Sequence, residues 1–508
     1  WMNTQRPEWN DANNALVGRG LSVVTLAQLR RYVAFLQGLL TRDVSLSTEL
    51  ADLLAELHSI LSRHADQARA GFTDAERRGV MDELGTAGSD FRARVYSGAS
   101  GQVSRVQSDA VRGLLDLALV FADAGLRANR REDGLYHSYN VLDLGSGTAA
   151  VRRLSVMLEG QVAVLSSGLL TPEDCLNVLA SLRASALYRA DQDSYMLYPD
   201  RDLPRFLDRN QVPADRVGTL MRSLIEAGDQ SVVLSDVNGV VRFASAIHNA
   251  RDVVAALHSL PSGLAGSDDE QADLLAAFED TFRHAEFTGR SGSFFAYEGL
   301  GSIYWHMVSK LLLAVQENLE LAVASGAGVD VIGRLRAAYE DVRHGLGYCK
   351  SPAVYGAFPV DPYSHTPAGK GAKQPGMTGQ VKEEVLTRLG ELGLRVESGV
   401  VVFSPVLLRA SEWTQAPSVF AYRDVAGVGR ELDLPVGSLA FTFCQVPVVY
   451  RLVDGSSAEG VGGLSPTGLV VTLDDGTQVT ANDRLDATLS ASLFARTGRI
   501  ASIQVDLG

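Results

Sequence analysis

The chain has 508 residues, enough for two or three domains around a large buried core. Its formal net charge of −14 argues against nucleic acid as a partner, whereas an acidic surface is compatible with a neutral sugar. The three cysteines lie far apart, and no histidine spacing indicates zinc, so neither a disulfide framework nor a metal site is expected. Because no apolar run reaches about 18 residues, we expect a soluble, cytoplasmic protein without a membrane partner.

Hydrophobic periodicity predicts that most of residues 14–130 is helical. Apolar residues recur at spacings of three and four, the stripe of an amphipathic helix, at Leu26, Leu29, Val33, Leu36 and Leu40. The pattern becomes strand-like over 136–144. Helical patterns return at 218–227, 250–259, 270–284, 299–325, 329–344 and 380–393. Within the fourth of these, 299–325, His306 is interpreted as a barrel-lining or core histidine.

After about Gly393 the pattern changes to short β-rich runs. They are separated by turn signals such as Asp454-Gly455 and Asp475-Gly476. This arrangement predicts a C-terminal β-sandwich over residues 394–508, following a mainly helical domain over residues 1–393.

A glycine-rich stretch, NVLDLGSGT over 140–148, looks like the first motif of S-adenosylmethionine-dependent methyltransferases. Such a loop can hold a nucleotide at a helix N-terminus. However, the next strand-like run, VAVLSS, lacks the acidic residue that binds the ribose, and no alternating βαβ series follows. A tight glycine turn is therefore the better interpretation.

The N-terminal segment carries a recognisable motif, EWNDANN over 8–14, followed by GRGLS over 18–22 and an apolar helix. It resembles the catalytic segment of glycoside hydrolase family 94, the cellobiose and chitobiose phosphorylases, whose D-W-N-D-G-M-N-like motif precedes Gly-Arg-Gly-Glu-Ser. In that family the aspartate two residues after the tryptophan is the general acid. The resemblance therefore implies that Asp11 is the catalytic acid, with Glu8, Trp9 and Asn10 in contact with substrate.

The chemistry of glycosidic cleavage suits these residue types, because a proton must be delivered to the leaving oxygen. A carboxylic acid can deliver this proton when burial or a neighbouring carboxylate raises the pKa of the acid. Glu8 could be the neighbouring carboxylate that raises the pKa of Asp11. Trp9 could shield the acid and stack on a pyranose ring. The alternative interpretation is structural, since Asp and Asn also favour helix starts as caps.

Three further segments match the same family in the same order. Residues 162–200 look like its helix and loop that end in an apolar-Tyr-Pro sequence. Residues 291–314 look like its N-G-G-I-F-C-H segment and the following helix. Residues 362–396 look like its A-G-K-D-A … W-L-T-G-T-A segment. The four matches imply an (α/α)6-barrel-type helical domain, complete or partial, with inserts near 40–150 and 205–285.

The resemblance also implies a phosphate site. The threonine and glycine of W-L-T-G, which help to bind phosphate in the family, match Thr378 and Gly379, and a hydroxyl at a helix N-terminus suits an anion. The family's phosphate-contacting histidine aligns with Tyr297, which carries no positive charge. His365 or Lys370 could compensate for it.

The expected reaction is inverting phosphorolysis of a β-linked gluco-oligosaccharide to α-glucose 1-phosphate, with inorganic phosphate as co-substrate and no metal or organic cofactor. The alternative is an inverting β-glucan hydrolase, with Asp11 as acid and Glu298, beside Tyr297 in the substrate site, as base. A third interpretation is a non-catalytic sugar-binding subunit.

In family 94 the acid lies in the middle of the barrel, whereas Asp11 is close to the start of this sequence. We therefore expect an N-terminal portion, or a separate chain, to complete the barrel, and a homodimer is compatible with this. The larger inserts resemble those of the longer β-1,3-glucan phosphorylases related to the family.

Overall fold

The computed structural model describes residues 20–200, 205–261, 263–282, 300–358, 363–376, 378–453 and 464–508, with the side chains at 206, 378 and 379 left out. The chain forms two compact units. Unit 1 comprises Trp1–Leu170, Asn177–Tyr304 and His365–Lys373. Unit 2 comprises Thr171–Leu176, Trp305–Ser364 and Gln374–Gly508.

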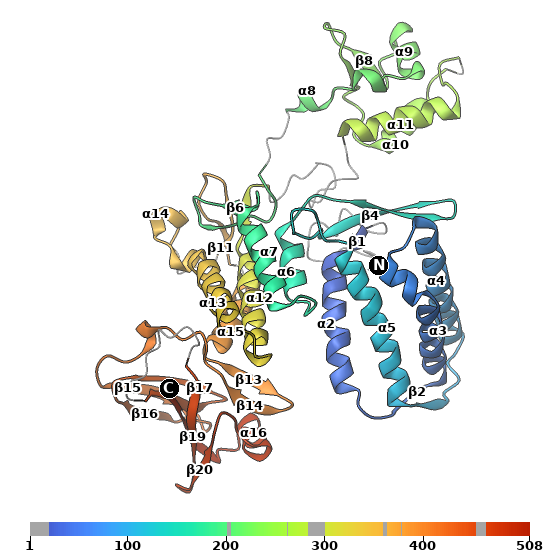
Figure 1. The fold of residues 1–508 in the computed structure, drawn as a ribbon. Coiled ribbons are helices and arrows are strands. Elements are labelled where there is room, and N and C mark those ends of the chain that lie inside the picture. The colour runs from blue at the N-terminus through green and yellow to red at the C-terminus, as the bar shows by residue number, and fades with distance from the viewer. Residues whose placement is uncertain are drawn as a thin grey trace. The chain divides into compact units, whose positions relative to one another are not determined.

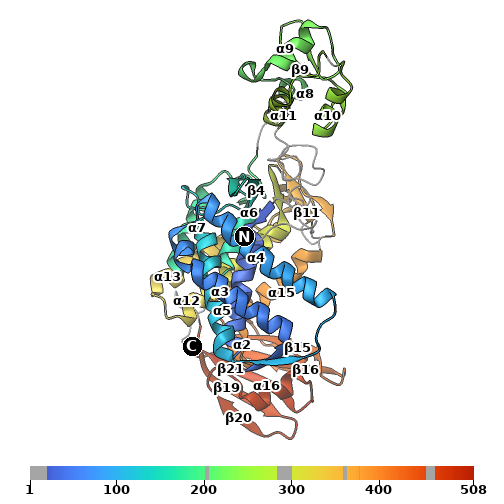
Figure 2. The same cartoon turned by 90° about the vertical axis from the view of Figure 1, so that its right-hand side faces the viewer.

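Unit 1 begins with a layer of helices that lie side by side (Figure 1 and Figure 2). Their bounds are α2 (Val23–Leu39), α3 (Thr48–Ala70), α4 (Asp74–Tyr96) and α5 (Ser108–Arg127). The Ser22 side chain caps α2 by accepting the Thr25 N–H, and Thr73 with Glu76 forms a capping box on α4. The helices agree with the hydrophobic periodicity. The short strands β2 (Val44–Ser47), between α2 and α3, and β3 (Val103–Val106), between α4 and α5, pair with each other antiparallel.

An antiparallel sheet packs with these helices in the order β1 (Gly20–Ser22), β4 (Tyr139–Gly145), β5 (Thr148–Arg153). Gly145 pairs with Thr148, so the glycine-rich stretch is the two-residue turn of a hairpin, and Gly147 takes φ +77° there. A strand follows the turn instead of the helix that a nucleotide loop requires. The interpretation as a tight glycine turn is confirmed.

The chain continues through α6 (Leu158–Leu165), α7 (Pro172–Ala184), β6 (Tyr188–Arg189) and β7 (Ser194–Tyr195). It then enters a module with its own hydrophobic core. The module contains α8 (Phe206–Arg209), α9 (Thr219–Glu226), β8 (Val233–Ser235), β9 (Val241–Phe243), α10 (Ala250–His258) and α11 (Asp268–Phe282). The rings of Phe243 and Phe278 meet edge to face at 5.0 Å in its centre, among buried aliphatic side chains.

Three short strands form another sheet, in the order β10 (Ser302–Tyr304), β11 (Tyr363–Pro367), β12 (Lys373–Pro375). The sequence predicts a helix over 299–325, but 302–304 is a strand because its backbone pairs with β11. The helix starts afterwards, at Trp305.

Unit 2 contains α12 (Trp305–Ala324), α13 (Val329–His344), α14 (Pro352–Tyr355) and α15 (Thr378–Glu391). The helix α12 packs against both α13 and α15, and most of its side chains are buried. None of the described helices is long and apolar enough to cross a bilayer.

The C-terminal part of unit 2 is rich in strands, as the sequence predicts. A five-stranded sheet has the order β17-β18-β21-β19-β20, with β18 and β21 parallel and the other pairs antiparallel. The bounds are β13 (Leu394–Glu397), β14 (Val400–Phe403), β15 (Ser418–Arg423), β16 (Gly429–Leu434), β17 (Ser438–Phe443), β18 (Val446–Leu452), β19 (Pro466–Leu473), β20 (Gln478–Ala481), α16 (Ala487–Phe494) and β21 (Ile500–Leu507). The protein thus combines helical regions with β regions, whereas the barrel and the two-sheet sandwich stay predictions.

Candidate active site

The residues expected to carry out the chemistry lie outside the described parts of the chain. These are the predicted acid and its neighbours, together with the pair that replaces the family's histidine: Glu8, Trp9, Asn10, Asp11, Tyr297 and Glu298. The site is therefore built here from the described residues that flank them.

Two of the segments that resemble the family lie side by side in unit 1. Tyr198 forms a β-bridge with Leu300, and Met196 forms another with Ile303. Between these bridges the Leu197 N–H donates to the Ser302 carbonyl oxygen at 3.0 Å. Backbone hydrogen bonds thus hold the end of segment 162–200 against segment 291–314.

A third segment joins them through β11. Tyr304 pairs with His365, and their rings stack with centroids 4.9 Å apart and an interplanar angle of 21°. The buried Arg189 side chain strengthens the junction, because its Nη1 donates to the Thr366 carbonyl oxygen at 2.7 Å. His365 is therefore half-buried within this sheet, whereas Lys370 lies exposed in the turn after β11.

The N-terminal segment reaches the same place through a hydrophobic cluster. Its buried members are Tyr139, Val141, Leu154, Met157 and Tyr198, and Val24, Leu197 and Leu300 pack against them. Val24 follows directly after β1, which is paired with β4. Described stretches of all four segments that carry the resemblance therefore meet within unit 1, although they come from distant parts of the sequence.

A buried carboxylate accompanies this cluster and was missed from the sequence. Glu159, in α6, is 5% exposed and accepts a hydrogen bond from the Tyr139 hydroxyl at 3.0 Å. A buried acid needs such partners, because desolvation of an unpaired carboxylate is costly. The available signal was a lone acid in the otherwise apolar stretch LEGQVAVL.

A second group of polar residues lies within unit 2, at the starts of two helices. His306 is the second residue of α12, and its Nε2 lies 3.0 Å from Oε2 of Glu383 in α15. His306 is 7% exposed and Glu383 3%. Lys382 lies on the other side of the carboxylate, with its Nζ 3.3 Å from Oε1.

The charge of His306 depends on opposing influences. Burial is the largest and lowers its pKa; Glu383 raises the pKa, and Lys310 and Lys382 lower it. The net pKa lies below the ordinary value of a histidine, so the ring is largely neutral at neutral pH in the free protein.

The predicted phosphate residues are in the same unit as this pair. The helix α15 starts at Thr378, so the backbone of Thr378 and Gly379 forms its first turn, although their side chains lie outside the described residues. N–H groups in a first turn lack intrahelical partners and carry the positive end of the helix dipole. Glu383 follows five residues after Thr378, about 7.5 Å along the helix axis. The predicted phosphate residues and the Glu383 partner of the buried His306 thus lie in the same helix, α15.

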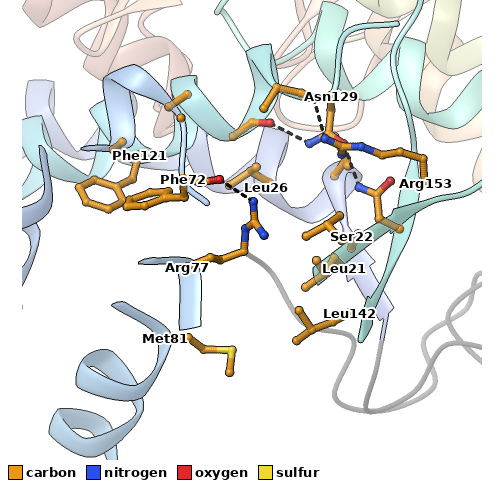
Figure 3. A pocket seen from close by; sticks show the side chains of 18 of the residues that line it. Leu21, Ser22, Leu26, Phe72, Arg77, Met81, Phe121, Asn129, Leu142 and Arg153 are labelled. Atoms are coloured by element: carbon orange, nitrogen blue, oxygen red, sulfur yellow. Dashed lines mark hydrogen bonds between the residues drawn. The ribbon is translucent and has the colours of Figure 1, made fainter. Parts of the chain in front are cut away.

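Unit 1 also contains a cavity of about 380 Å³ between β1, β4, β5 and the helices α2 to α5 (Figure 3). Phe72, Phe121 and Leu26 make much of it apolar. At its polar side, Arg77 donates to the carbonyl oxygen of Phe72, and Arg153 donates to the side chain of Asn129 (Figure 3). Of the predicted phosphate residues, His365 and Lys370 have described side chains, and neither of these two lines the cavity. Within the described residues, no group of three or more His, Cys, Asp or Glu side chains could hold a metal ion.

Comparison with known proteins identifies one part of the chain. Residues 203–285 match the family model described as GH149 phosphorylase insertion domain 2. This range nearly coincides with the module that has its own core and with the insert that the sequence analysis places at 205–285. No curated protein matches the chain. The insertion-domain match supports a relationship to glycoside phosphorylases, and hence an enzyme of carbohydrate metabolism, but it does not support glycoside hydrolase family 94 in particular.

Proposed function

We propose that the protein is an inverting glycoside phosphorylase that acts on a β-linked gluco-oligosaccharide. The observation that carries this proposal is the match of residues 203–285 to an insertion domain of GH149 phosphorylases. The description of the matching model names an insertion into a phosphorylase. The surrounding chain is therefore best read as the catalytic domain of such an enzyme.

The contacts in unit 1 support the proposal independently. The four segments resemble phosphorylases in sequence, and that resemblance is independent of which segments are in contact. Their meeting through strand pairs and one hydrophobic cluster is what a shared active site requires. Chance matches scattered along the chain would have no reason to be neighbours.

In the proposed reaction Asp11 protonates the oxygen that leaves the anomeric carbon. The bond between that carbon and the leaving oxygen breaks, while a phosphate oxygen attacks the carbon from the opposite face. The products are α-glucose 1-phosphate and an oligosaccharide one unit shorter. The substrate's β linkage and the inversion follow from the resemblance in the sequence.

His306 is a further candidate for binding phosphate. The family's N-G-G-I-F-C-H pattern can also be placed on residues 300–306, LGSIYWH. This register keeps Gly301, Ile303 and His306 and an aromatic residue at Tyr304. We propose that His306, with the first turn of α15, binds phosphate, a role for which His365 and Lys370 are the alternatives.

The test is synthesis from α-glucose 1-phosphate with a panel of β-linked disaccharide acceptors, following phosphate release. Release with one acceptor supports the proposal and names the linkage. If no acceptor releases phosphate, but β-glucans yield free sugar without phosphate, the protein is a hydrolase and Glu298 becomes the candidate base.

Asp11→Asn should lower turnover by about 10²- to 10⁴-fold, the usual contribution of a general acid, while the thermal unfolding temperature stays unchanged. Asp330→Asn is the matched control, because that carboxylate is 82% exposed on α13 and should leave activity intact. Normal turnover in the Asp11 variant would remove this residue from the mechanism.

A further inference from the structure

We propose that the cavity of unit 1 binds a small molecule with an apolar body and a single carboxylate, such as a medium-chain fatty acid or an aromatic acid. The cavity lies between the sheet β1-β4-β5 and the helices α2 to α5 (Figure 3). The inference is independent of the proposed function, because it assigns a ligand to a cavity to which the proposed reaction gives no role.

The size and the lining of the cavity suit a small organic molecule. Its volume of about 380 Å³ falls within the usual range of ligand pockets, about 300–1,000 Å³. Most of the described lining is apolar, and its large members that are only half-buried are Leu21, Phe72, Met81, Leu142 and Val151. A ligand with a hydrocarbon body would remove more of this apolar surface from water, which favours binding.

The charged side chains of the described lining are both basic. Arg77 extends from α4, and Arg153 extends from the last position of β5 (Figure 3). Arg77 forms an ion pair with Asp74, whose Oδ1 lies 2.5 Å from its Nη1. Among the described residues, no carboxylate forms an ion pair with Arg153. Its Nη1 donates to the Asn129 side chain, and its Nη2 donates to the Ala128 carbonyl oxygen at 2.8 Å.

One positive charge in the cavity is therefore not balanced by a carboxylate. Partial burial lowers the pKa of Arg153, and the charge of Arg77 lowers it further. The guanidinium nevertheless stays protonated, and its five N–H groups form a planar fork that fits a carboxylate. The contacts with Asn129 and Ala128 use two of these N–H groups.

This balance of charge and polarity excludes other ligand classes. A neutral sugar would place most of its hydroxyl groups against apolar walls, where they lack hydrogen-bond partners. A nucleotide or a sugar phosphate would also bring more negative charge than one guanidinium balances. A molecule with one carboxylate supplies a single negative charge, and its apolar body matches the rest of the lining.

The charged part of the cavity is also in contact with solvent. Arg153 is exposed, whereas Leu26 and Phe121, which line the cavity from α2 and α5, are 4% and 8% exposed. Phe121 forms an aromatic pair with Phe72, with ring centroids 6.0 Å apart, on the other side of the cavity from Arg153 in Figure 3. The ligand thus directs its apolar body toward the aromatic pair and keeps its carboxylate near Arg153 and water.

A purely structural role for the two arginines is the competing explanation. Ala128 is the C-cap of α5, and an arginine that donates to the last carbonyl groups of a helix stabilises its end. Arg77 likewise donates to the carbonyl oxygen of Phe72. Loss of stability on mutation cannot separate the two explanations, because both predict it. The preference for a carboxylate over a neutral molecule with the same body can separate them.

The experiment is isothermal titration calorimetry on the full chain with octanoate, octan-1-ol, 3-phenylpropionate and acetate. Octanoate should bind with one molecule per chain and about tenfold more tightly than octan-1-ol, because the alcohol lacks the charge that meets Arg153. Acetate, which has no apolar body to bury, should bind at least about tenfold more weakly than octanoate. Tighter binding of 3-phenylpropionate than of octanoate would support an aromatic ligand, and the reverse order an aliphatic one.

Two pairs of variants locate the binding site. Arg153→Met should weaken octanoate binding about tenfold and leave octan-1-ol binding unchanged. Its control is Arg152→Met, the neighbour in β5 that pairs with Asp143 and is not part of the lining. Ala124→Leu places a larger side chain in the cavity from α5 and should weaken binding of both molecules at least about tenfold. Ala110→Leu, at an exposed position of the same helix, should change neither.

Circular dichroism shows whether each variant is folded, and the Ala124 pair decides the question if Arg153→Met does not fold. Equal affinity of the wild type for octanoate and octan-1-ol would overturn the inference, as would the absence of binding by both acids. Equal octanoate affinity in folded Arg153→Met and Arg152→Met would also overturn it. Octanoate binding that Ala124→Leu leaves unchanged would place the acid elsewhere on the protein and reject this cavity.

Discussion

Glu391 at the end of α15 should be one of the most sensitive positions for the stability of unit 2. It is 4% exposed and accepts hydrogen bonds from the Tyr339 hydroxyl at 2.8 Å, from Nη1 of Arg388 at 2.8 Å and from Nε of Arg343 at 3.1 Å. Burial alone would raise its pKa, but these hydrogen bonds and the charges of Arg409 and Arg343 outweigh burial and lower it.

Replacement by glutamine keeps the size of the side chain but removes its charge. Breaking one partner out of a buried ionic cluster costs about 3–5 kcal/mol, and we take the lower end, about 3 kcal/mol, because Arg388 is 41% exposed and partly screened. Glu340→Gln is the matched control. That carboxylate is 38% exposed and 3.8 Å from Arg409, so its loss should cost at most about 0.5 kcal/mol.

The assay is urea unfolding followed by tryptophan fluorescence, because the buried Trp305 and Trp413 both lie in unit 2. A carboxylate whose pKa is lowered by folding stabilises the protein above its unfolded pKa of about 4.3, and this contribution is lost as pH falls through the folded value. The difference between wild type and Glu391→Gln should therefore be full at pH 7 and shrink below about pH 4. A cost at pH 7 no larger than that of Glu340→Gln would refute the reasoning.

Two further predictions concern a glycine and the cysteines. Gly393→Ala should destabilise unit 2 by at least about 2 kcal/mol in thermal unfolding, because φ is +70° and a Cβ would lie 2.2 Å from the Pro405 nitrogen. Gly399→Ala is the control, because its φ is +82° but a Cβ there would lie in open space, so it should cost only the backbone strain of about 1–2 kcal/mol. Equal losses of stability in the two variants would contradict the predicted clash. Cys175 is fully buried, and burial together with its acidic neighbours raises the pKa of its thiol to about 12. At pH 8 iodoacetamide should therefore label the exposed Cys349 before Cys175, as followed by mass spectrometry. Labelling of Cys175 at the same rate as Cys349 would show that this part of the core opens.

Local patterns were sufficient to predict which segments are helical, but not which residues are buried. The stripe over Leu26 to Leu40 correctly indicates α2, and Leu26 and Val33 are buried as expected. Leu29, from the same stripe, is 37% exposed, while Phe35, outside it, is apolar and 61% exposed. Periodicity reports the repeat of a helix, whereas burial depends on neighbours that are distant in sequence.

Strand β10, which belongs to the candidate active site, is also an element that the local sequence pattern does not predict. Ser302-Ile303-Tyr304 stands at the front of a long helical pattern and was predicted as helix. Its backbone instead pairs with residues 365–367, a partner that no local window contains. The strand then orders the chain so that the helix starts at Trp305 and His306 falls in its first turn.

The family's N-G-G-I-F-C-H motif can be aligned in two registers, one that ends at Tyr297 and one that ends at His306. The start of α12 at Trp305 helps to distinguish them. From the sequence, Phe295-Ala296-Tyr297 retains an aromatic run, whereas LGSIYWH retains the histidine itself, and neither has an evident advantage. The structure brings Glu383, 77 residues later, within hydrogen-bond distance of His306, in the helix whose first turn is the predicted phosphate site. This contact with the helix that carries the predicted phosphate residues favours the second register. If Asp11 is the acid and the phosphate site lies elsewhere in the chain, as proposed, Asp11→Asn should lower turnover by about 10²- to 10⁴-fold without changing the affinity for phosphate.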